Sequence, residues 1–188
     1  MLRASGLEFG YGRPPLVDKP SFSLAAGGLL FVRGANGSGK STLLNVIEGQ
    51  HPFTGGQLTW NDQSPTGLTQ RSFQTPSYPS DMTVRALFRA LGRSVPAALS
   101  ELQSKRFGGL SFGDRKWVEE ERVLGSSRAI LRLGEPEAGR AAGGRAQLRS
   151  RVAGARARGA AVMWVAHEAV AGDEDVLDLN AAPAPKRL

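Results

Sequence analysis

The sequence predicts an α/β fold with a mostly parallel central sheet and an antiparallel strand region near the N-terminus. Residues 29–32 form a short apolar run, as buried parallel strands do. A glycine-rich stretch follows at residues 34–39, and Leu43, Leu44 and Ile47 then share one face of a predicted helix over 41–47. A strand, a tight glycine loop and a helix in succession indicate that the sheet is built around residues 29–32.

The rest of the chain adds strands and a helix to this unit. Residues 7–9, 21–24 and 55–60 read as strands bounded by turn residues. Apolar residues at 84, 87, 88 and 91 predict a helix over 84–91. A strand followed by a loose end is expected between 172 and 188. The length of 188 residues fits a single domain over 1–188 with one substantial core.

Composition excludes several kinds of protein. The chain has no cysteine, so neither a disulfide framework nor a thiolate metal site can form. No apolar run is long enough to cross a bilayer, and residues 1–6 lack the apolar core of a signal peptide. We therefore expect a soluble chain that reaches a membrane only through a partner.

The net charge of +7 raises the question of an anionic partner. Six arginines without an intervening acid carry much of the excess, and no aromatic residue lies among them to stack on bases, so we do not expect a nucleic-acid partner. Two interpretations remain open: a solvated helix face, or a basic surface near acidic headgroups. These arginines are Arg140, Arg145, Arg149, Arg151, Arg156 and Arg158.

The glycine-rich stretch fits the pattern G-x-x-x-x-G-K-[ST] of a phosphate-binding loop. Its glycines let the backbone aim several N–H groups at one point, and the helix N-terminus adds partial positive charge there. Lys40 is expected to reach the β- and γ-phosphates, and the Ser41 hydroxyl is a predicted Mg²⁺ ligand. The predicted nucleotide site consists of Gly34, Ala35, Asn36, Gly37, Ser38, Gly39, Lys40, Ser41 and Thr42.

Five further stretches lie before and after this loop. They are Tyr11 after a short strand, Gln74 ahead of Met-Thr-Val at 82–84, Leu-Ser-Phe-Gly-Asp at 110–114, an apolar strand ending in Gly-Glu-Pro at 134–136, and an apolar strand ending at His167. With the phosphate loop, they resemble the ATP-binding subunit of ABC transporters over roughly residues 7–168. The resemblance implies a P-loop NTPase fold of ABC-ATPase type, with a shortened helical subdomain at about 84–125, and ATP and Mg²⁺ as cofactors.

The resemblance also assigns catalytic roles. It implies that Glu135 polarises the attacking water, that His167 holds the γ-phosphate, and that Gln74 binds Mg²⁺ together with Ser41. The residues alone allow simpler roles. Glu135 could cap the next element, His167 could be a hydrogen-bonded histidine at a strand end, and Gln74 could be a surface glutamine.

Three other residues would contact nucleotide. Tyr11 is expected to stack on adenine, although a loop aromatic packed on a neighbour is the alternative. Ser111 and Gly113, within the stretch that resembles the family's signature, would cap the ATP of an opposing ATPase subunit.

The chain departs from the family's pattern between residues 110 and 141. Gly134 stands where the family has the aspartate that supports Mg²⁺, and Phe112 replaces a signature glycine. Both weaken the expectation of hydrolysis more than that of ATP binding. The remaining departures are Asp114 for glutamine, Ala141 for aspartate, Arg132 inside an apolar strand, and the acidic run at 119–121.

The preferred function is an ATP-binding and ATP-hydrolysing subunit that drives transport through a separate membrane subunit. It would pair with a second ATPase subunit and lie in the cytoplasm, peripheral at the inner face of the cell membrane. One alternative is a regulatory subunit that binds ATP with little or no hydrolysis, which Gly134 and Phe112 favour. A soluble ABC-type ATPase acting on nucleic acid or ribosomes is suggested only by the arginines.

Overall fold

The computed structural model describes residues 1–11, 17–73, 75–134, 136, 142–165 and 175–180. Among these residues the strands are β1 (Leu2–Phe9), β2 (Val17–Asp18), β3 (Phe22–Leu24), β4 (Leu29–Arg33), β5 (Gly55–Trp60), β6 (Thr69–Arg71), β7 (Ile130–Gly134), β8 (Ala161–Val165) and β9 (Asp175–Asp178). The helices are α1 (Lys40–Glu48), α2 (Val84–Ala90), α3 (Phe112–Leu124) and α4 (Ala142–Ala157), with short 3-10 helices η1 (Ala97–Leu102) and η2 (Phe107–Gly109).

A parallel sheet forms the centre of the fold, as the sequence predicted. Its strand order is β6-β7-β8-β4-β9, and each neighbouring pair is parallel. Because side chains alternate between the two faces of a strand, the apolar runs divide between two cores. Leu30 and Val32 of β4 join the core that contains α1, whereas Leu29 and Phe31 join the core beneath α4.

A smaller antiparallel sheet is organised around β1, which pairs with β2, β3 and β5. The predicted strand at 7–9 is therefore only the end of a longer one that begins at Leu2. Residues 2–5 alternate buried and exposed positions; residues 2–4 pair with both β3 and β5, and Ser5 pairs with β5. Arg3 and Ser5 occupy the exposed positions of this alternation.

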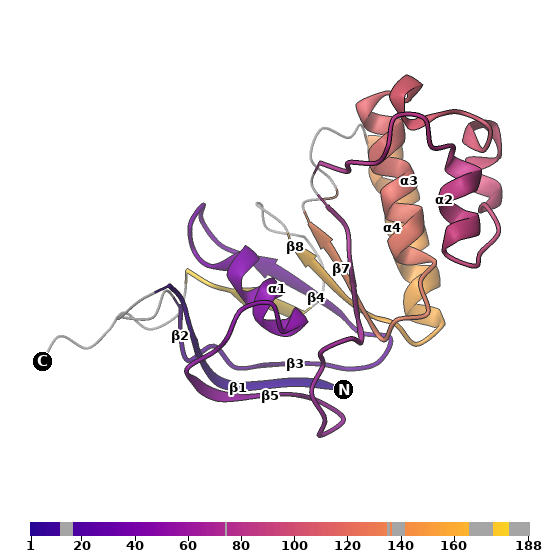
Figure 1. Ribbon diagram of the computed structural model, residues 1–188. Helices are drawn as coiled ribbons and strands as arrows, with labels where there is room; N and C mark the ends of the chain where they lie inside the picture. Colours follow the sequence, from indigo (N-terminus) through magenta and orange to yellow (C-terminus); the bar gives the residue numbers. More distant parts are fainter. Residues whose placement is uncertain (12–16, 74, 135, 137–141, 166–174, 181–188) are drawn as a thin grey trace, which may run out of the picture.

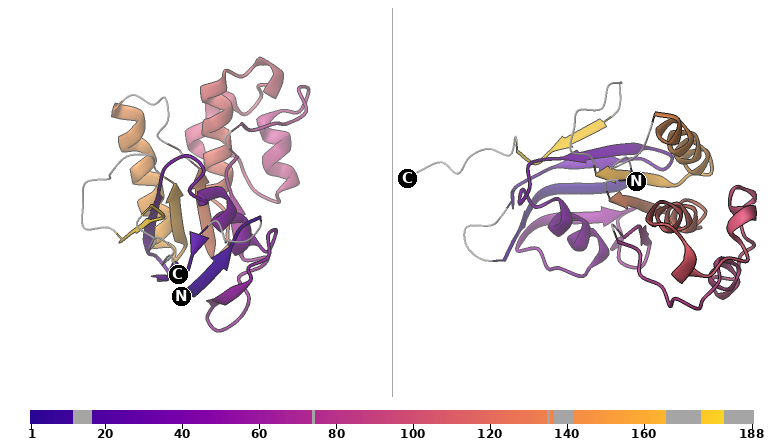
Figure 2. Two further views of the ribbon diagram at one scale, coloured as in Figure 1. Left: turned by 90° about the vertical axis from the view of Figure 1, so that its left-hand side faces the viewer. Right: turned by 90° about the horizontal axis from the view of Figure 1, so that it is seen from above.

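Helices cover the parallel sheet on opposite sides (Figure 1). Helix α1 lies between this sheet and the antiparallel sheet, while α3 and α4 lie on the other face. The view from above in Figure 2 shows the same separation. Helix α2, η1 and η2 pack with the start of α3 around a third apolar cluster that includes Phe88, Leu99 and Phe107. These elements fall within residues 84–125, where the resemblance implied a shortened helical subdomain.

Candidate functional site: the phosphate loop and the pocket beside it

The loop at residues 34–39 joins the carboxyl end of β4 to the first turn of α1. Gly37 and Gly39 have φ angles of 83° and 94°, in the left-handed region that other residues rarely adopt. A Cβ atom on Gly34 would lie 2.3 Å from the Ser38 hydroxyl oxygen. The glycines are therefore required by backbone geometry, and the sequence prediction of a sharply turning loop is confirmed.

Lys40 is buried and folds back over the loop that precedes it. Its Nζ donates hydrogen bonds to the carbonyl oxygens of Gly34 at 2.7 Å and Ala35 at 2.9 Å. Helix α1 begins after Gly39, which has no side chain to cap the first-turn N–H groups. An ammonium group and a helix N-terminus thus converge on one loop, an arrangement that favours a bound anion.

The Ser38 hydroxyl supports the same conclusion. Its oxygen is buried and has no hydrogen-bond partner among the described residues. An unpaired buried hydroxyl is costly, and a phosphate oxygen bound in the loop would supply the missing partner. The loop residues therefore fit a phosphate group by shape, charge and hydrogen-bonding capacity.

The segment after β9 also holds the loop, which the sequence did not reveal. The backbone N–H of Ala35 donates to Asn180 Oδ1 at 2.8 Å, and Arg33 forms an ion pair with Asp178 at 2.8 Å. Residues 172–188 carried no functional interpretation, because nothing in their composition indicates which strand they join. The parallel pairing of β9 with β4 places Asp178 beside Arg33.

A pocket of about 230 Å³ opens beside the loop, between α1 and the carboxyl ends of β6 and β7. Lys40 and Ser41 from α1, Arg71 from β6, and Arg132 and Gly134 from β7 contribute to its wall. Leu44, Asn45, Ser72, Phe73 and Val165 complete the lining. Parallel strands and a helix N-terminus often bind ligands at this edge.

Arg132 is the unexpected component of this pocket. The side chain is 1% exposed, donates to the carbonyl oxygen of Leu44, and forms an ion pair with Glu48. Burial lowers the pKa of Arg132, and the adjacent Glu48 carboxylate acts in the opposite direction. The arginine that interrupts the predicted apolar strand is thus accommodated by a partner on α1.

Magnesium does not fit the described side chains around this pocket. Of the side-chain oxygens on its wall, Asn45 Oδ1 accepts a hydrogen bond from Arg71, and Ser72 Oγ accepts one from the Gly134 N–H. That leaves Ser41, one of the two predicted ligands, as the remaining candidate. Elsewhere in the described part of the chain, no three histidine or acidic side chains gather as a metal site.

Several predicted site residues lie outside the described residues: Gln74, Glu135 and His167, together with Ala141. Their roles remain predictions. Thr42 is buried in α1. Tyr11 is 79% exposed and packs edge to face on His51, with ring centroids 4.8 Å apart. This contact agrees with the alternative of a packed loop aromatic, and stacking on adenine stays a prediction.

The stretch that resembles the signature lies at the start of α3. Ser111 caps this helix by accepting a hydrogen bond from the Asp114 N–H, and its hydroxyl donates to Asp114 Oδ2 at 2.8 Å. Phe112 is 60% exposed at the first position of the helix. Gly113 lies in the first turn, where a Cβ would meet only the Ser111 hydroxyl, at 3.8 Å. Capping of an opposing ATP by Ser111 and Gly113 stays a prediction.

The acidic run on α3 is buried and paired. Glu119 accepts bonds from both Nε and Nη2 of Arg122 at 2.8 Å, from the Phe73 N–H at 3.0 Å, and from the Tyr78 hydroxyl. Glu121 forms an ion pair with Arg151 of α4. The acids that departed from the family's apolar pattern therefore tie α3 to its neighbours.

Arginines of α4 make internal contacts as well. The Arg149 guanidinium lies 5.6 Å from the centre of the Trp164 ring, so this side chain packs on the sheet instead of extending into solvent. Such partners are found for Arg149, Arg151, Arg156 and Arg158 of the basic stretch. A purely solvated helix face is therefore an incomplete description.

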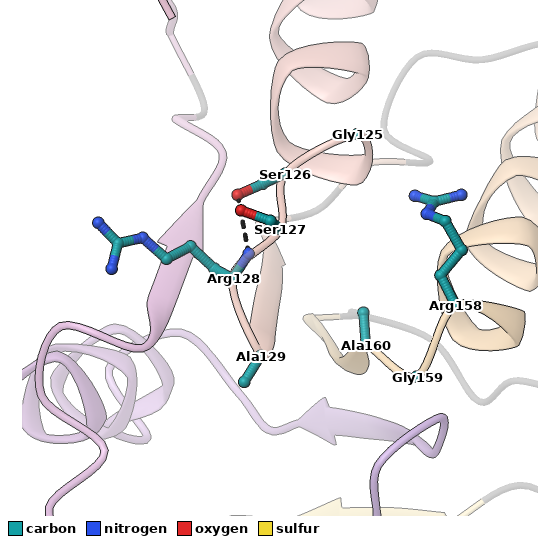
Figure 3. Close-up of a pocket in the computed structure, with 8 residues that line it drawn as sticks. All are labelled: Gly125, Ser126, Ser127, Arg128, Ala129, Arg158, Gly159 and Ala160. Carbon is teal, nitrogen blue, oxygen red and sulfur yellow. Dashed lines mark hydrogen bonds between the residues drawn. The ribbon is translucent and has the colours of Figure 1, made fainter. Parts of the chain in front are cut away.

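A second cavity, of about 410 Å³, lies at the opposite, amino ends of β7 and β8 (Figure 3). In this view the side chain of Arg128 extends to the left and that of Arg158 extends upward. Arg128 donates to the carbonyl oxygen of Gly67, and Arg158 donates to those of Leu124 and Gly154. With its charged donors already engaged, this cavity is a weaker candidate than the pocket beside the phosphate loop.

The parallel sheet, the glycine loop and the helix that follows it define a nucleotide-binding protein of the P-loop class. The family profile of ABC transporters matches residues 17–138, well over half of the chain. The chain therefore belongs to the ABC transporter family, as one of its ATP-binding proteins.

Individual relatives agree with this assignment. The chain is 29% identical to the cytochrome c biogenesis ATP-binding export protein CcmA of Ruegeria pomeroyi, over 98% of this chain and 95% of that protein. It is 30% identical to the hemin import ATP-binding protein HmuV of Bordetella pertussis, over 71% of this chain and 61% of that protein. A putative ABC transporter ATP-binding protein from Pyrococcus furiosus superposes with a TM-score of 0.82, at 18% identity, covering 97% of this chain and 99% of that one.

Proposed function

We propose that this chain binds ATP at residues 34–42 and hydrolyses it to drive transport through a separate, membrane-embedded subunit. Lys40, the loop N–H groups and the Ser38 hydroxyl would hold the phosphates. The observation that carries the proposal is the folded phosphate loop, with its ammonium group and an unsatisfied buried hydroxyl. Glu135 and His167 would act on water and the γ-phosphate, as the resemblance implies.

The assembly is part of the proposal. No described helix of this chain is both long and apolar enough to pass through a bilayer. The membrane passage would come from another subunit, and the chain would work on the cytoplasmic face, paired with a second ATPase subunit. The relatives named above serve cytochrome c biogenesis export and hemin import, which are the first settings to test for this chain.

A second candidate function is a regulatory subunit that binds ATP with little or no turnover. Two observations favour it. Gly134 contributes no carboxylate to the pocket. Phe112, within the stretch that resembles the signature, is 60% exposed. Magnesium held by Ser41 and Gln74 remains a prediction from the resemblance.

ATP binding and steady-state hydrolysis on the purified chain separate these functions, with Lys40→Ala and Glu135→Gln as variants. If the chain is a working ATPase, the unmodified protein should hydrolyse ATP and both substitutions should abolish hydrolysis. Glu135→Gln should still bind ATP. Tight binding without turnover in the unmodified chain would select the regulatory function. Absence of ATP binding would refute both.

A further inference from the structure

The pocket beside the phosphate loop carries an excess of positive charge. Lys40, Arg71 and Arg132 all line it. Glu48 is the carboxylate that contacts the two arginines, at 3.2 Å from Arg71 and in an ion pair with Arg132. Among the described residues, these three cations and one carboxylate leave a net charge of +2, immediately beside the first turn of α1.

Arg132 has hydrogen-bonding capacity to spare. Its side chain is 1% exposed, yet Nε has no hydrogen-bond partner among the described residues. Guanidinium groups stay charged in proteins, so this buried donor requires an acceptor. A phosphate oxygen is an acceptor of the right charge, and charge-assisted bonds of this kind are the strong ones.

The same pocket repels a divalent cation. Two of its three side-chain hydroxyl or amide groups, Asn45 and Ser72, already accept hydrogen bonds from Arg71 and the Gly134 N–H. Gly134 has strand geometry with no left-handed backbone angle and brings no side chain to the pocket. Because like charges repel strongly where water is excluded, the two arginines, which share one carboxylate, oppose the binding of Mg²⁺ beside them.

We propose that this chain binds ATP without a divalent cation, with Arg71 and Arg132 providing the positive charge beside the phosphates that Mg²⁺ would otherwise provide. The inference rests on the proposed function, since it concerns the same site. Arg71 is the more direct test because its side chain is partly exposed and its removal leaves the buried Arg132–Glu48 pair in place.

The experiment measures the affinity for a non-hydrolysable ATP analogue by calorimetry, once with excess Mg²⁺ and once with excess EDTA. The unmodified chain is expected to bind equally well, within about twofold, in both conditions. Arg71→Met should lower the affinity in EDTA by about tenfold or more, the typical effect of losing a hydrogen bond to a charged group. Arg85→Met, the same substitution at an exposed position of α2, is the matched control and should bind like the unmodified chain.

Different failures have different meanings. If Mg²⁺ raises the affinity of the unmodified chain by tenfold or more, or if Arg71→Met binds normally in EDTA, the inference is wrong and the proposed function stands. If the unmodified chain fails to bind in either condition, the proposed function falls with it. A thermal melt of each variant shows that Arg71→Met is folded, so that lost affinity reports on the pocket.

Discussion

Replacing Glu119 by alanine should destabilise the fold more than any substitution of an exposed acid in this chain. The Glu119 carboxylate is fully buried and accepts four hydrogen bonds, two of them from Arg122. The Arg122 side chain is itself only 10% exposed. The substitution therefore removes one partner and leaves a guanidinium buried without its carboxylate.

The magnitude follows from that geometry. Removing one member of a buried ion pair costs about 3–5 kcal/mol, because the remaining charge stays desolvated. For a chain of this length, each kcal/mol lowers Tm by roughly 2–4 °C, so the expected drop is about 6–20 °C. A loss of this size is a large part of the total stability, which is about 5–15 kcal/mol for natural domains.

Urea unfolding followed by circular dichroism gives the free energy of unfolding directly. Glu101→Ala, at an exposed position of η1, is the matched control and should change stability by less than about 0.5 kcal/mol. The double variant Glu119→Leu with Arg122→Met should recover part of the loss, because an apolar pair leaves no unpaired charge. A cost below about 1 kcal/mol for Glu119→Ala would show that water reaches the pair and that the reasoning is wrong.

Two further predictions concern stability. Burial, and then the Glu119 carboxylate, raise the pKa of Tyr78 above its ordinary value of 10.0, so the folded state keeps its phenol proton at a pH where the unfolded state loses it. The free energy of unfolding should therefore fall as pH rises above about 10. In urea titrations, Tyr78→Phe should show a smaller fall over the same pH range. An equal fall in the variant and the unmodified chain would contradict the assignment. Gly56→Ala should cost at least about 2 kcal/mol, since φ is 84° and the new Cβ would lie 2.3 Å from the Gly6 carbonyl oxygen. Gly67→Ala separates backbone strain from this clash, because Gly67 has a φ of 81° but open space around the new Cβ. This substitution should cost about 1 kcal/mol in the same assay.

The sequence predicted those features that depend on neighbouring residues. The phosphate loop is local: its glycines, Lys40 and the helix that follows all lie within residues 34–48, so pattern alone locates them. The buried charges were not predictable in this way. Arg132 looked like an error in an apolar strand because its partners, Leu44 and Glu48, lie more than 80 positions earlier on another element.

Residues 71–73 connect the two buried charge clusters. The Arg71 side chain contacts Glu48 and Asn45 of α1, while its carbonyl oxygen accepts a bond from Arg122 of α3 at 2.8 Å. The Phe73 N–H donates to Glu119 on the same helix. One short segment is thus bonded to the helix that follows the phosphate loop and to the helix that follows the signature. A displacement of α3 relative to α1 has to break or rearrange bonds made by this segment.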